Sequence, residues 1–124
     1  MATGLEPNHE LPVFEQDEAI ARHDNDPQFL CEMIGFGVPE IREAVERFER
    51  HTETENWPEA TRAVHSIKGL MLQLGGTRAA SLAAQMEAMS RQQSGDVRES
   101  IAPLRQVIAT TERELQAFAN RYEP

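Results

Sequence analysis

The sequence predicts an all-α protein, specifically an antiparallel four-helix bundle with an additional short N-terminal helix. Three observations support this fold class. Apolar residues recur at steps of three and four along most of the chain, as one face of an α-helix requires. Aromatic residues make up only 6% of the 124 residues and β-branched runs are absent, which disfavours an all-β fold. At 40% hydrophobic residues, the chain can bury the core of one domain.

The N-terminal residues Met1–Pro12 are mostly polar and contain two prolines, so we expect a flexible tail there. Residues 13–124 are then expected to form a single bundle. Its first helix is short and is predicted over Phe14–His23.

The second helix begins at Asp24–Pro27, where an aspartate can cap a helix that has proline in its first position. The segment Gly35–Pro39 contains two glycines and a proline, and we expect it to kink or break this helix. Helical spacing resumes at Ile41 and ends near Thr52.

A third helix is predicted from the Asn56 cap to Leu74, where Gly75–Gly76 supplies the stop. Thr77 can cap a fourth helix that runs to about Arg91. Leu82, Met86 and Met89 are expected to point inward from this fourth helix.

A turn at Ser94–Asp96 precedes the last helix, which Pro103 either kinks or begins. Apolar residues in this helix alternate steps of four and three, which is the seam of a packed bundle. The residues of this seam are Val97, Ile101, Leu104, Ile108, Thr111, Leu115, Phe118 and Tyr122.

Charge and composition exclude several classes of function. The net charge is −9, so nucleic acid and anionic membrane surfaces are disfavoured as partners. The acidity lies in residues 1–60, whereas the second half is mildly basic. No secretory signal or membrane-spanning run is visible, and the single cysteine, Cys31, cannot form an internal disulfide. We therefore expect a cytoplasmic protein.

One face of the third helix carries an unusual set of residues. Placed on a helical wheel, the apolar residues of Glu59–Leu74 form a stripe opposite His65, so this histidine is predicted to point into solvent. Lys68 and Gly69 lie one turn further on, and Leu72 is on the same outward face. A glycine inside a helix costs about 1 kcal/mol relative to alanine, which suggests that another molecule must come close.

A solvated neutral imidazole beside a lysine suits phosphoryl chemistry. The ring of His65 is mostly uncharged and nucleophilic at neutral pH. The charge of Lys68 favours the unprotonated ring and can stabilise an attached phosphoryl group. Three further polar side chains are candidates to flank that group, namely Arg62, Gln73 and Arg91.

The segment Ala63–Gly69, followed by Leu74-Gly75-Gly76, resembles the H-x-x-K-G signature of histidine phosphotransfer (HPt) domains. The resemblance covers roughly Phe14 to Tyr122 and is closest over Arg62–Glu87. It implies that His65 takes a phosphoryl group from an aspartyl phosphate on a response-regulator receiver domain and passes it to another receiver.

The same resemblance implies roles for the neighbours of His65. Lys68 matches the lysine that steadies the phosphate, and Gly69 matches the glycine that lets the receiver approach. The sequence departs from the family at Leu70, where small residues are common, and at Gly35–Pro39, where the family has a continuous helix. Magnesium and an acidic pocket are expected on the receiver, and no cofactor is expected in this chain.

The sequence leaves three forms of this function open. The first is a free-standing phosphorelay protein, which is favoured because the chain begins with Met and ends soon after its last helix. The second is the phosphoacceptor module of a larger sensor or chemotaxis kinase. The third is an adaptor that binds receivers without being phosphorylated. The chain has no kinase motif of its own, so it is expected to be a carrier and not an enzyme.

Two further expectations concern assembly and metals. We expect a monomer, since nothing in the sequence demands a second copy. A metal site is not expected, because the remaining histidines lack ligand spacing and Glu6-x-x-His9 occurs once, in the tail.

Overall fold

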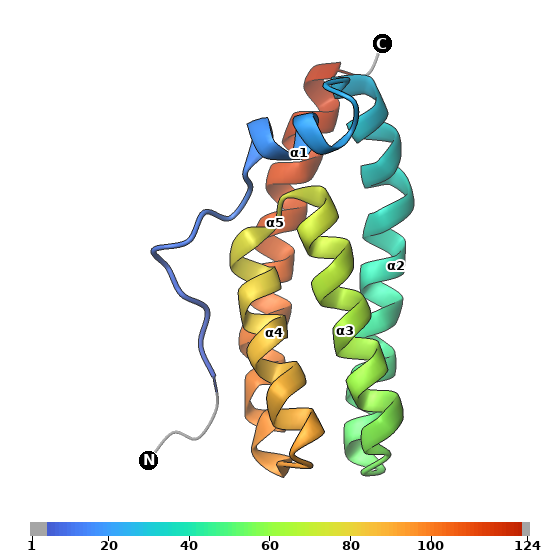
Figure 1. The fold of residues 1–124 in the computed structure, drawn as a ribbon, viewed down its shortest axis with the longest axis vertical. Coiled ribbons are helices and arrows are strands. Elements are labelled where there is room, and N and C mark those ends of the chain that lie inside the picture. The colour runs from blue at the N-terminus through green and yellow to red at the C-terminus, as the bar shows by residue number, and fades with distance from the viewer. Residues whose placement is uncertain (1–4, 123–124) are drawn as a thin grey trace.

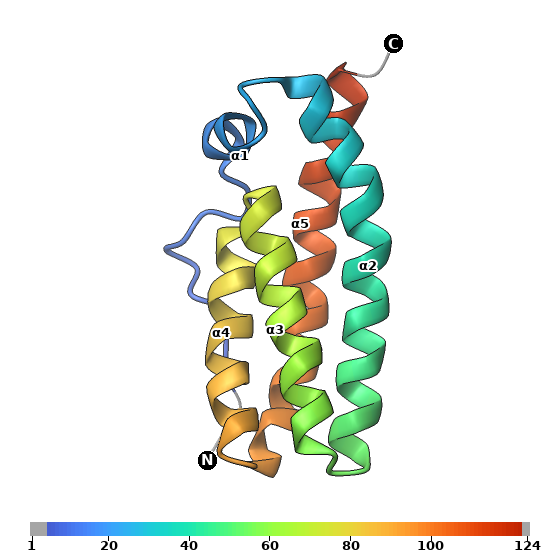
Figure 2. The ribbon, with the colours of Figure 1, turned by 45° about the vertical axis from the view of Figure 1, so that its right-hand side comes forward.

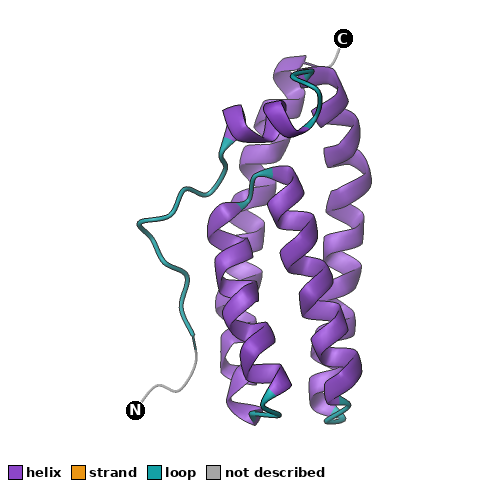
Figure 3. Ribbon diagram, viewed as in Figure 1, coloured by secondary structure: helices purple, strands orange, loops and turns teal. Residues whose placement is uncertain are grey.

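The computed structural model describes residues 5–122. Residues 5–15 form a segment without helix, and the rest of the described chain consists of helices joined by short connections (Figures 1 and 3). Four long helices lie side by side (Figure 2), and their bounds are α2 Pro27–Glu53, α3 Trp57–Leu74, α4 Thr77–Arg91 and α5 Ile101–Tyr122. The short helix α1 Gln16–Arg22 crosses one end of the bundle, and a 3₁₀ helix, η1 Gly95–Ser100, leads into α5. The predicted all-α bundle is confirmed, including the short N-terminal helix.

The predicted interruption of the second helix is wrong. Helix α2 is continuous through Gly35–Pro39, and Pro39 lies inside it. The ring of a proline crowds the carbonyl four residues earlier, which here belongs to Gly35. Gly35 is exposed and has no neighbouring atom within 4 Å of an added Cβ, so this turn has room to adjust.

Gly37 shows why a glycine is needed in this part of α2. A Cβ at this position would lie 2.9 Å from Cδ1 of Leu74 on α3. The missing side chain therefore lets α2 and α3 approach closely beside the end of α3, and α2 and α3 pack against each other along their length.

Helix α3 begins and ends as predicted. The side chain of Asn56 accepts a hydrogen bond from the backbone N–H of Glu59, and Pro58 lies in the first turn. At the other end Gly75 has φ 83°, the left-handed conformation that stops helices. The Gly75 carbonyl then accepts a hydrogen bond from the backbone N–H of Glu15, which joins the start of α1 to the end of α3.

The start of α4 differs in detail from the prediction. The N-cap is Gly76, and Thr77 is the first helical residue. The Thr77 hydroxyl donates to the Glu15 carboxylate and does not cap its own helix. Pro103 lies in the first turn of α5, two residues after its start at Ile101, where backbone N–H groups have no partner inside the helix, so a proline costs no helical hydrogen bond there.

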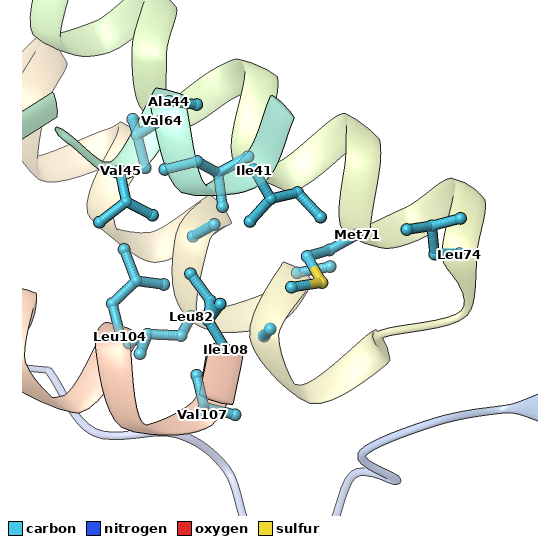
Figure 4. Close-up of a cluster of buried hydrophobic side chains, with 14 of the residues drawn as sticks. Ile41, Ala44, Val45, Val64, Met71, Leu74, Leu82, Leu104, Val107 and Ile108 are labelled. Carbon is cyan, nitrogen blue, oxygen red and sulfur yellow. The ribbon is translucent and has the colours of Figure 1, made fainter. Parts of the chain in front are cut away.

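The core runs along the axis of the bundle and takes side chains from all four long helices (Figure 4). The residues of the seam predicted for the last helix are buried except for Tyr122, although Val97 lies in η1 and not, as predicted, in the last helix. Leu82 and Met86 of α4 are buried as expected, and Met89 packs partly buried against the core. The residues labelled in the close-up are Ile41, Ala44, Val45, Val64, Met71, Leu74, Leu82, Leu104, Val107 and Ile108.

Residues 5–12 of the expected tail make specific contacts with the bundle, which were not predicted from the sequence. Arg78 on α4 donates side-chain hydrogen bonds to the carbonyls of His9 and Leu11. The backbone N–H of Leu5 donates to the Ser100 hydroxyl. Residues 1–4, the rest of that expected tail, lie outside the described part. Among residues 5–122, no helix is both long enough and apolar enough to cross a bilayer.

Candidate functional site

His65 lies in the middle of α3, on the side that faces away from the core. Its side chain is 62% exposed, which confirms the exposure predicted from the helical wheel. Val64 and Ile67, its neighbours on the helix, are fully buried, and they fix the rotation of α3 about its axis. Beside His65 the surface forms an open groove between α3 and α4, lined by His65, Lys68, Ala84, Glu87, Ala88, Arg91 and Gln92.

The imidazole is held at one of its two nitrogens. Nδ1 of His65 is 3.0 Å from Oε2 of Glu87, a residue of α4 that is only 4% exposed. An ionised carboxylate only accepts hydrogen bonds, so Nδ1 carries the proton in this contact. Nε2 of the neutral ring then keeps its lone pair.

Glu87 is the centre of a charged cluster. Its Oε1 is 2.8 Å from Nζ of Lys68, and its Oε2 is 2.6 Å from Nη2 of Arg91. Burial raises the pKa of Glu87, but the hydrogen bonds and the charge interactions with Lys68 and His65 together lower it by more, so the carboxyl pKa lies below its ordinary value. The cluster contains two cations and one carboxylate, and it therefore keeps one net positive charge beside the groove.

The outward face of α3 leaves space around His65. Gly69 is exposed, and a Cβ added there would meet no atom within 4 Å. Leu72 is 42% exposed on the same side of the helix. On α4 the groove is lined by the short side chains of Ala84 and Ala88, both exposed. A large molecule can therefore approach the imidazole from this side without displacing a side chain of Gly69, Ala84 or Ala88.

The other residues named from the sequence are placed differently. Arg91 reaches the cluster through Glu87, as described above. Arg62 is exposed and pairs with Glu59 on its own helix, not with His65. Gln73 is exposed near the end of α3, where no described hydrogen bond joins it to the cluster. Leu70 packs partly buried against the core, as expected for the core edge.

Glu87 was not among the site residues predicted from the sequence. A signal was present, because Ala80, Ala83, Glu87 and Ser90 follow helical spacing and all four are buried. A carboxylate at a buried helix position among small or apolar side chains needs cationic or hydrogen-bonding partners. The structure supplies those partners from α3, and their identity could not be read from α4 alone.

Metal ligands do not converge in this part of the chain. Across residues 5–122, no three histidine, cysteine, aspartate or glutamate side chains come together in a way that could hold an ion.

Comparison with known proteins agrees with the geometry. A model of the Hpt domain family matches residues 32–121, well over half of the chain. Searches of curated proteins and of solved structures found no significant match. The matched region includes all of α3 and α4, and with them His65, Lys68 and Glu87. The chain therefore belongs to the Hpt domain family, the histidine phosphotransfer modules of two-component signalling.

Proposed function

We propose that His65 accepts a phosphoryl group from an aspartyl phosphate on a receiver domain and passes it to the aspartate of another receiver. The observation that carries this proposal is the state of the imidazole. Nδ1 is held by the buried Glu87 while the side chain remains 62% exposed, so Nε2 is presented to solvent as the nucleophile.

The transfer can be written with its atoms balanced. The lone pair of His65 Nε2 attacks the phosphorus of the aspartyl phosphate, and an N–P bond forms. The P–O bond to the aspartyl oxygen breaks, and the electron pair leaves with the aspartate carboxylate. The Nδ1 proton stays on the ring, where Glu87 stabilises the developing positive charge. Transfer to the next receiver reverses these steps.

Lys68 is well placed to stabilise the phosphoryl group. Its ammonium is 2.8 Å from Glu87 at the edge of the groove, and the side chain is 28% exposed. Because the cluster keeps one net positive charge, it can accept the negative charge of a phosphoryl group on the neighbouring imidazole. Lys68 then shares its hydrogen bonds between Glu87 and the phosphoryl oxygens.

The receiver docks on the outward face of α3, over Gly69 and Leu72. The bare backbone at Gly69 lets the receiver aspartate come within reach of Nε2, and Leu72 supplies an apolar contact. Hpt domains are phosphocarriers, not kinases, so the magnesium ion and the acidic pocket of the in-line transfer belong to the receiver. We propose that the chain acts as a cytoplasmic monomer.

The test is transfer from a phosphorylated receiver. A receiver domain is loaded with radiolabelled phosphoryl groups from a small acyl phosphate, freed of donor and mixed with the full chain. We expect label on this chain that is labile in acid and stable in alkali, and no label on a His65→Gln variant. Binding of phosphorylated receivers without any transfer would refute the relay and favour the adaptor.

A further inference from the structure

The least ordinary feature of the site is that one buried carboxylate serves three donors. Oε2 of Glu87 accepts from Nδ1 of His65 at 3.0 Å and from Arg91 at 2.6 Å, while Oε1 accepts from Lys68 at 2.8 Å. Glu87 is 4% exposed, so water does not replace these donors readily. A neutral glutamine would fill nearly the same space and could still accept from Nδ1. The size and the hydrogen-bonding capacity of the side chain therefore do not explain why position 87 carries a negative charge.

The charge matters most once the ring carries a phosphoryl group. When that N–P bond breaks, its electron pair returns to Nε2. If Nδ1 holds a proton, the ring leaves as neutral imidazole, which is a good leaving group. If Nδ1 has lost its proton, the ring must leave as an imidazolate anion, which is a poor one. Protonation of Nδ1 therefore controls how readily phosphorylated His65 gives up its phosphoryl group, to water or to a carboxylate.

We propose that Glu87 is a positioning residue whose negative charge keeps Nδ1 of phosphorylated His65 protonated and so makes the phosphoryl group short-lived and easily released. This inference rests on the proposed function, because it requires His65 to be a phosphoryl carrier. It goes beyond that function by assigning the lifetime of the phosphorylated state to one carboxylate on a neighbouring helix.

The charges around the ring support the direction of this effect. Lys68 from α3 and Arg91 from α4 are the charged groups that the described residues place on Glu87, and both disfavour a protonated ring. The negative charge of Glu87 offsets one of these two cations, and its carboxylate also accepts a hydrogen bond directly from the Nδ1–H of His65. With glutamine at position 87, two cations would face the ring with no anion between them. The protonated ring would then lose both its hydrogen-bonded anion and its electrostatic compensation.

The experiment uses the full chain phosphorylated by phosphoramidate, a donor that needs no receiver. Nε2 attacks its phosphorus, the P–N bond of the reagent breaks and ammonia leaves. Loss of the phosphoryl group is followed by intact-protein mass spectrometry from about pH 5 to about pH 9. We expect Glu87→Gln to move the midpoint of the pH profile down by about one unit, which lengthens the lifetime at pH 8 by about tenfold.

Arg91→Gln is the matched comparison, because Arg91 competes with His65 for the same oxygen, Oε2. Removing this mostly exposed cation should move the midpoint to higher pH, opposite to Glu87→Gln. A general loss of packing would move both variants in the same direction. Nitrogen-15 NMR of the unphosphorylated imidazole gives a second readout, with the proton expected on Nδ1 in the parent chain.

Two outcomes would overturn the inference. One is a Glu87→Gln variant that is folded by circular dichroism and has the same pH profile as the parent. The other is failure of phosphoramidate to label His65, which would show that Nε2 is not a reactive nucleophile. A chain that carries phosphoryl on His65 with the expected profiles, but exchanges it with no receiver, would refute the proposed function and leave the role of Glu87 standing.

Discussion

Replacing Gly69 tests whether the bare backbone beside His65 exists for a partner or for the fold. Gly69 lies inside α3, is exposed, and has no atom within 4 Å of an added Cβ. Its backbone conformation is helical, so an L-residue fits there without strain. Nothing in the fold of the isolated chain therefore requires glycine at this position.

The effect on stability follows from this geometry. Alanine in a helix interior is more favourable than glycine by about 1 kcal/mol, and no clash opposes the gain at this site. Gly69→Ala should therefore raise the free energy of unfolding by about 1 kcal/mol and the melting temperature by about 4 °C. Gly69→Leu should also leave the chain at least as stable as the parent.

The effect on transfer should have the opposite sign. A leucine side chain at position 69 would stand one turn from His65, in the space that an approaching receiver needs. A displacement of the reacting groups by about 1 Å can cost about 100-fold in rate, so Gly69→Leu should slow transfer from a receiver by about that factor. Labelling by phosphoramidate should change much less, because that reagent is small.

Gly35→Ala is the matched control. Gly35 is also an exposed helix-interior glycine with an empty surround, but it lies on α2, which does not line the groove beside His65. It should not change the transfer rate. Urea unfolding and single-turnover transfer, measured on the same preparations, show whether Gly69 serves the approach of a receiver or the stability of the fold. A destabilised Gly69→Ala variant, or receiver transfer to Gly69→Leu at the parental rate, would refute the reasoning.

Three further predictions concern the cluster around the imidazole. His65→Gln should remove all labelling and leave the circular dichroism spectrum unchanged. The free energy of unfolding should stay within about 0.5 kcal/mol of the parent, because the side chain is mostly exposed and the glutamine amide can still donate to Glu87. Lys68→Ala should slow transfer from the receiver by about tenfold, because one charge-assisted hydrogen bond to the phosphoryl group is lost. An unchanged single-turnover transfer rate would show that Lys68 does not stabilise the phosphoryl group. The pKa of Glu87 is lower in the folded chain than its ordinary value of 4.5, so the unfolded chain takes up this proton first as the pH falls. The carboxylate therefore stabilises the fold above about pH 4.5 and loses that contribution below it, and the difference in urea stability between the parent and Glu87→Gln should shrink from about pH 7 to about pH 3.

Much of the fold was predictable because it depends on local signals. The Asn56 cap, the Gly75 stop and the apolar spacing of α3 each act within a few residues, and all three appear in the structure as predicted. The interruption predicted at Gly35–Pro39 failed because packing outweighed a local preference. Ile34 and Ile41, on either side of that segment, are both buried, and their burial holds the two halves of α2 in one continuous helix.

In the candidate site, too, the features that depend on one helix were predictable, and those that depend on contacts between helices were not. The exposure of His65 and the position of Gly69 beside it follow from the period of one helix, so a wheel was sufficient to find them. Glu87 acts on His65 across the contact between α3 and α4, 22 residues away along the chain, and no periodicity within α3 reports it. What α4 does report is a carboxylate at a buried helical position, which is costly unless cations or hydrogen-bond donors meet it. Lys68 is the only lysine in the chain, and its contact with α4 gives a reason for its position. The same ammonium that is expected to stabilise a phosphoryl group also compensates the buried charge of Glu87, which holds the imidazole of His65.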